Sequence, residues 1–107
     1  MNNLQKPLHH LQTEQSLLAS LMSIEDSFNK ISEIICEDDF SFEQHRLIFR
    51  AIKVVYEQGH PVDNVTVHDQ LERSKTLHSA GGDSCIAVIM DVGISTLFNF
   101  EYNAERI

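Results

Sequence analysis

The chain has 107 residues, the size of one domain, and 42% of them are apolar, which is enough for a single hydrophobic core. Its formal net charge of -8 comes from 16 acidic and 8 basic residues, and the basic ones are spread singly, so direct binding to nucleic-acid phosphates is not expected. No apolar run approaches the roughly 18 residues of a membrane span, and the N-terminal MNNLQKPLHHLQ lacks the apolar core of a signal peptide. These features predict a cytoplasmic protein without a membrane segment.

The first half of the chain opens with two stretches that have the apolar spacing of helices. The first helix is predicted from a stripe made of Leu11, Leu17, Leu18, Leu21 and Met22. A second helix is predicted over about Glu25–Ile35, and its apolar residues are Phe28, Ile31, Ile34 and Ile35.

The third predicted helix has the clearest boundaries. Ser41–Gln44 reads SFEQ, the pattern of a capping box, in which Ser41 caps the helix and Gln44 reaches back to the cap amide. The helix should end at Gly59, which can take a left-handed conformation, and Pro61 prevents its continuation. Its apolar arc is wide, so it is predicted to be the most buried helix. The arc comprises Ile48, Ile52 and Val55, with Phe49 and Tyr56 beside them.

Three more helices are predicted in the second half. One covers roughly Val65 to Ser74, turns Val67 and Leu71 inward, and is capped by Asp63 or Asn64. The next covers about Gly82 to Val92. The last begins near Leu97, carries the apolar residues Phe98, Phe100 and Tyr102, and meets no stop signal before Ile107. The predicted fold is all-α, a compact bundle of about six short helices. The unfinished last helix suggests that residues 1–107 are one helical domain of a longer protein; the alternative is that its last turn frays at a natural terminus.

The glycine pair Gly81–Gly82 precedes an apolar run and raises the question of a phosphate-binding loop. A P-loop needs GxxxxGK[ST], in which lysine neutralises the phosphates and the hydroxyl holds magnesium. No lysine follows here, and Asp83 would repel an anion. The interpretation is a tight turn into the fifth helix, with Asp83 near the positive end of its dipole.

Other constellations that could support catalysis are also missing. The six histidines show no HxxxH or HExxH spacing, and His45 is interpreted as a packing or capping residue. A zinc site assembled from distant residues is the alternative left open. Cys36 and Cys85 lie among apolar neighbours and are predicted to be reduced core residues. The carboxylate runs at Glu25–Asp26 and Glu37–Asp39 fit solvated turns. No catalytic, cofactor-binding or metal-binding residue is therefore assigned, and partner-binding residues are not identified.

Five short motifs, in this order, resemble the N-terminal domain of DnaB-type replicative DNA helicases. They are EQSLLASLM at Glu14–Met22, DDF at Asp38–Phe40 followed by HRLIF at His45–Phe49, GHPVDNVTV at Gly59–Val67, LER at Leu71–Arg73, and the glycine pair. In the resemblance, Phe40 would pack onto the third helix and the Thr66 hydroxyl would serve backbone amides at the start of the fourth. Two places depart from the family pattern: Cys85 stands where an aromatic is usual, and Asn103–Ala104 where a Tyr-Ala pair is common.

The resemblance implies a non-catalytic domain of a longer protein whose motor domain uses ATP and magnesium to move along single-stranded DNA. It implies that such domains form a collar on a hexameric ring and contribute to binding primase and helicase loaders. The chain itself would need no cofactor and would not bind nucleic acid directly. Two alternatives remain at this stage: the helicase-binding C-terminal domain of a primase, which is a similar helical bundle, and a small metal-dependent hydrolase that uses histidine and aspartate.

Overall fold

The computed structural model describes residues 8–91 of the chain, and within that range every regular element is helical. The elements are α1 (Leu8–Ser23), α2 (Ser27–Ile31), a short 3-10 helix η2 (Glu37–Asp39), α3 (Glu43–Glu57), α4 (Asn64–Arg73) and a helical segment over residues 85–91. The prediction of an all-α bundle is confirmed. The helix predicted from Leu97 lies outside the described residues. No helix within residues 8–91 has both the length and the apolar character needed to cross a bilayer.

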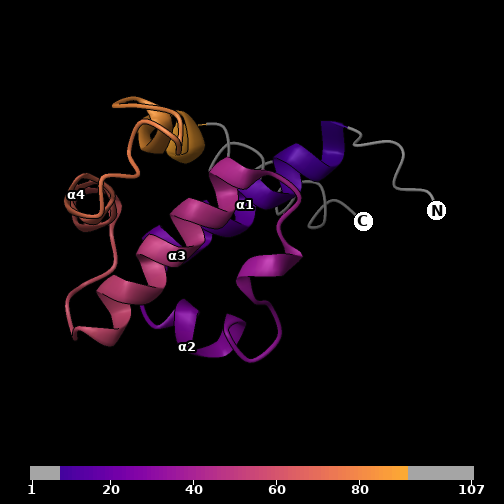
Figure 1. Ribbon diagram of the computed structural model, residues 1–107. Helices are drawn as coiled ribbons and strands as arrows, with labels where there is room; N and C mark the ends of the chain where they lie inside the picture. Colours follow the sequence, from indigo (N-terminus) through magenta and orange to yellow (C-terminus); the bar gives the residue numbers. More distant parts are fainter. Residues whose placement is uncertain (1–7, 92–107) are drawn as a thin grey trace.

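The long helix α3 is the centre of the bundle. It packs against α1, α4 and η2, and Figure 1 shows it crossing α1, with α2 below and α4 seen end-on beside it. Ile48 and Ile52 are fully shielded from solvent and Val55 nearly so, which confirms the predicted inward face. The largest completely buried side chains are Phe40, Leu18, Leu21, Ile48, Ile52, Leu71 and Val67.

The connection from α3 to α4 follows the local sequence closely. Gly59 has a φ of 79°, its amide donates to the Tyr56 carbonyl at 3.0 Å, and the next amide, of His60, donates to Val55 at 3.2 Å. This pair of bonds is a Schellman motif, so α3 ends where the glycine predicts. Asp63 then caps α4: its carboxylate accepts from the Thr66 amide at 2.9 Å, and the Thr66 hydroxyl accepts from the Asp63 amide at 3.0 Å.

The capping box predicted at Ser41 is wrong. α3 begins at Glu43, the residue before it is Phe42, and no side chain caps the helix. The Ser41 amide instead donates to a carboxylate oxygen of Glu14 at 2.7 Å. A contact from α1, 27 positions away in sequence, therefore fixes the backbone before α3 in place of a local cap.

The second helix is shorter than predicted. α2 starts after Asp26, which has a left-handed φ of 66°, and it ends at Ile31 in tight turns rather than continuing to Ile35. Ile34 consequently points outward and is 79% exposed. Cys36 is also exposed, so its prediction as a core residue is wrong, whereas Cys85 is buried as predicted.

The fifth helix begins three residues later than predicted. Gly81 and Gly82 both have positive φ, 122° and 90°, and form the turn that precedes the helix at residues 85–91. A Cβ on Gly81 would lie only 2.9 Å from Cβ of Cys85, so the turn needs glycine for its close approach as well as for its backbone conformation. The glycine pair is a tight turn, as predicted.

Candidate functional site

The most organised polar group of the molecule joins α1 to α3. Glu14 lies on the inner side of α1, and its carboxylate accepts from the Ser41 amide and pairs with His45 Nδ1, each at 2.7 Å. The side chains of Glu14 and His45 are only 11% and 4% exposed. Burial by itself raises the pKa of the Glu14 carboxyl, but the hydrogen bonds from His45 and Ser41 outweigh it, so the pKa lies below its ordinary value.

An ionised Glu14 can only accept hydrogen bonds, so the proton of this pair lies on His45 Nδ1. The histidine is thereby fixed by packing and by one partner, which agrees with its interpretation as a packing residue. Next to it, Arg46 Nε donates to the Phe40 carbonyl at 2.9 Å. The EQ motif of α1 and the DDF and HR parts of the second motif therefore meet at this point and are joined by hydrogen bonds.

A row of aromatic rings extends from this network along α3. Phe40 packs on Phe49 with ring centroids 5.2 Å apart, Phe49 on Phe28 at 5.7 Å, and Phe28 on Tyr56 at 4.8 Å. The resemblance predicted that Phe40 packs onto the third helix, and this contact is confirmed. The row ties η2 and α2 to α3, so it stabilises the fold rather than forming an open binding site.

The candidate nucleophiles and acids of the described residues lie in different environments. Burial raises the pKa of the Cys85 thiol, so it stays protonated and is a poor nucleophile. Glu37 forms an ion pair with Arg50, and the hydrogen bond from that guanidinium lowers the pKa of Glu37. Glu25 and Asp26 are exposed on the turn before α2. None of these four groups shares an enclosed cleft with a second titratable partner suited to acid–base chemistry.

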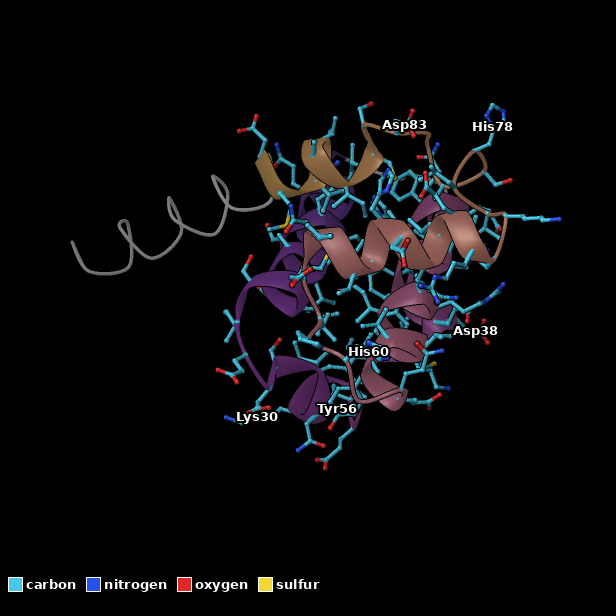
Figure 2. All side chains as sticks on the ribbon, turned by 90° about the vertical axis from the view of Figure 1, so that its left-hand side faces the viewer. Lys30, Asp38, Tyr56, His60, His78 and Asp83 are labelled. Carbon is cyan, nitrogen blue, oxygen red and sulfur yellow. The ribbon has the colours of Figure 1, made fainter. Side chains whose placement is uncertain are left out.

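Among the histidines whose side chains the structure describes, only His68 lies in a group of three potential metal ligands. His60 and His78 are both exposed, and Figure 2 shows His78 at the upper edge of the molecule and His60 lower down, near Tyr56. His68, on α4, lies near Asp83 in the turn after the glycine pair, with Nε2 3.7 Å from Oδ1. Sequence spacing did not indicate this approach.

A surface hollow lies at the end of the bundle where α1 and α3 finish. Its lining includes Met22, Ile24, Phe28, Tyr56, Pro61 and Val62. Ile24 is 53% exposed and Tyr56 37%, and Figure 2 places Tyr56 and His60 together at this end. Acidic side chains of Glu25, Asp26 and Asp63 border the apolar floor. The hollow is open and carries no convergent set of polar groups for a small substrate.

The sequence that carries these packed motifs is matched by a known family. Residues 6–107 match the family model of the DnaB-like helicase N terminal domain. The chain belongs to this family. The resemblance drawn from the five motifs is therefore confirmed, and the DnaB-like domain accounts for nearly the whole sequence.

Curated relatives of the DnaB-like domain are replicative helicases. The chain is 38% identical over 87 residues to "Replicative DNA helicase DnaB" of Buchnera aphidicola subsp. Schizaphis graminum, covering 81% of this chain and 19% of that protein. It is 31% identical over 101 residues to "Replicative DNA helicase DnaC" of Bacillus subtilis, covering 94% of this chain and 22% of that protein. The chain thus spans about a fifth of the length of these relatives.

A solved structure shares the fold of the DnaB-like domain. The crystal structure of the N-terminal domain of DnaB helicase from Mycobacterium tuberculosis superposes with a TM-score of 0.72 at 29% identity. The similarity covers 77% of this chain and 57% of that one. The helical arrangement of residues 8–91 is therefore that of a DnaB N-terminal domain.

Sequence reasoning missed the Glu14–His45 contact, although both residues lie in quoted motifs. The usable signal was an acid inside the apolar stripe of the first helix and a histidine one turn into the third. Glu14 has the spacing of an inward-facing position relative to Leu18 and Leu21, and a buried carboxylate needs a partner. His45, on the first turn of the most buried helix, was the available donor.

Proposed function

We propose that residues 1–107 form a non-catalytic N-terminal interaction domain of a replicative DNA helicase. Membership of the DnaB-like N-terminal family is the observation that carries the proposal. Two further points support it: the sequence contains no P-loop, and the chain corresponds to about a fifth of each helicase relative. The rest of such a protein would supply the motor.

The parent protein is, on this proposal, an ATP-dependent helicase that unwinds duplex DNA at the replication fork. Its motor domain binds ATP and magnesium, and the chain described here needs neither. The N-terminal domains associate as a collar of the hexamer and contribute to binding primase and the helicase loader. A function in DNA replication implies a cytoplasmic location.

The charge of the domain fits contacts with proteins better than contacts with DNA. A net charge of -8 repels a phosphate backbone, whose binding depends on lysine and arginine. Single-stranded DNA is therefore bound by the motor and not by this domain. Partners that carry basic surfaces would be attracted to it.

The alternative of a primase C-terminal domain is less well supported, because the family model and the named relatives are helicases. The alternative of a metal-dependent hydrolase had only the number of histidines in its favour.

The proposal is tested with the full-length gene and protein and with the 107-residue chain alone. The gene should continue past Ile107 and encode a GxxxxGK[ST] motif, and the full-length protein should hydrolyse ATP. The 107-residue chain alone should show no ATPase activity. A gene without that motif downstream, or ATP turnover by the purified chain, would refute the proposal.

A further inference from the structure

We propose that His68, Glu72 and Asp83 form a binding site for a divalent first-row transition-metal cation. One ligand atom from each of the three side chains lies within 4.8 Å of the other two. His68 and Glu72 are four residues apart on α4, so they lie on the same face of the helix, one turn apart. Asp83 comes from the turn that follows the glycine pair and lies at the upper edge of Figure 2.

The spacing of the ligand atoms suits a shared ion better than a direct hydrogen bond. His68 Nε2 and Asp83 Oδ1 are 3.7 Å apart, which is too long for a hydrogen bond. Two ligands of one tetrahedral zinc ion, with bonds of about 2.0–2.1 Å, lie about 3.3 Å apart. The three side chains would have to draw closer than they lie in the structure, and Asp83, whose side chain is 90% exposed, has room to move.

The charges at this place also favour a cation. Across residues 8–91, neither Glu72 nor Asp83 forms an ion pair with lysine or arginine. The neighbouring Arg73 is instead paired with Asp69 on the same helix, Nε to Oδ2 at 2.9 Å. Two carboxylates thus converge on an imidazole without a basic side chain to neutralise them.

The mixed donor set selects the class of ion. Imidazole nitrogen binds zinc, cobalt, nickel and copper well, whereas magnesium and calcium prefer oxygen ligands alone. Three protein ligands leave one or more positions for water. The ion would join α4 to the turn before the helix at residues 85–91, two segments that line one surface hollow through His68, Asp83 and Ile86.

Isothermal titration calorimetry of the 107-residue chain with Zn²⁺ tests this site. We expect one equivalent of Zn²⁺ to bind, and His68→Ala and Asp83→Asn each to weaken that binding at least about tenfold. His78→Ala is the matched control, because His78 is exposed on the preceding loop and lies outside the cluster, and it should bind as the parent chain does. His9 and His10 remain in every variant, so any zinc they hold cancels in the comparison.

Thermal unfolding gives the second measurement. Zinc should raise the melting temperature of the parent chain and of His78→Ala, and at the same zinc concentration should raise those of the two site variants less. Circular dichroism without metal checks that all variants are folded. Absence of saturable zinc binding, or equally tight binding in either site variant, would overturn the proposal.

Discussion

Replacing Glu14 by alanine tests the polar network that joins α1 to α3. The substitution removes the acceptor of two hydrogen bonds, from the Ser41 amide and from His45 Nδ1, both 2.7 Å long. His45 is 3% exposed, so its ring nitrogen cannot easily turn to water. The variant therefore leaves the buried ring nitrogen of His45 without its partner and removes the acceptor of the Ser41 amide, which is part-buried.

The expected cost follows from those two donors. Hydrogen bonds to a charged group are worth about 1.5–3 kcal/mol each, and breaking a buried pair from one side costs about 3–5 kcal/mol. The greater helix propensity of alanine returns only about half a kcal/mol. We expect Glu14→Ala to lose about 3–4 kcal/mol, a large part of the stability of a domain this size.

Urea unfolding followed by far-UV circular dichroism measures the loss. With the slope usual for a small domain, the midpoint should fall by about 2–3 M. Asp69→Ala is the control, because Asp69 forms an exposed pair with Arg73 on α4 and should cost less than about 0.5 kcal/mol. A loss in Glu14→Ala no larger than in Asp69→Ala would refute the reasoning, since water would then replace both hydrogen bonds.

The same pair predicts how stability depends on pH. The pKa of Glu14 is lowered in the folded chain, so its contribution is fully present above the ordinary value of 4.5 and is lost as pH falls through the folded pKa. Glu14→Gln has no such titration, and its stability should therefore fall less steeply in that acidic range than that of the parent chain. Parallel pH profiles for the two proteins would contradict the assignment.

Three substitutions test other parts of the fold. Ile52→Asp should unfold the domain, because a carboxylate at a site with no solvent exposure costs several kcal/mol. Its control, Ile34→Asp, changes a 79% exposed side chain and should melt normally. A normal melting curve for Ile52→Asp would show the core assignment to be wrong. Lys75 has a left-handed φ of 62° just after α4, a conformation that glycine adopts without the steric cost of a Cβ. Lys75→Gly should therefore raise the free energy of unfolding in urea by about 0.5–1 kcal/mol. A loss of stability would contradict this. Asp63→Ala should cost about 1 kcal/mol by removing the cap of α4, and an unchanged urea midpoint would mean that the Thr66 hydroxyl alone suffices.

Features set by neighbouring residues were predictable from the sequence. The Gly59 turn and the Asp63 cap each depend on residues within five positions, and both form as expected. The inward face of α3 was also predictable, because its apolar residues recur on one side of the helix and only one rotation of the helix buries them all. In these places local conformational preference and packing agree.

Features decided by distant contacts were not predictable. Helical spacing placed Ile34 in the core, but spacing cannot reveal that α2 ends at Ile31 and leaves Ile34 79% exposed. Ser41 has the residue type of a helix cap, yet its amide donates a hydrogen bond to the Glu14 carboxylate of α1. The approach of His68 to Asp83 depends on how the glycine turn folds back on α4. The expectation that no metal binds stays a prediction, and the zinc titration tests it.

The central claim is that this folded domain binds other replication proteins for a helicase. Capture of the cognate primase by the full-length protein tests it most directly, using the intact protein, the version without residues 1–107, and the Ile52→Asp and Ile34→Asp variants. We expect the intact protein and Ile34→Asp to retain primase, and the truncated protein and Ile52→Asp to lose it. Equal retention by the truncated protein would contradict the account.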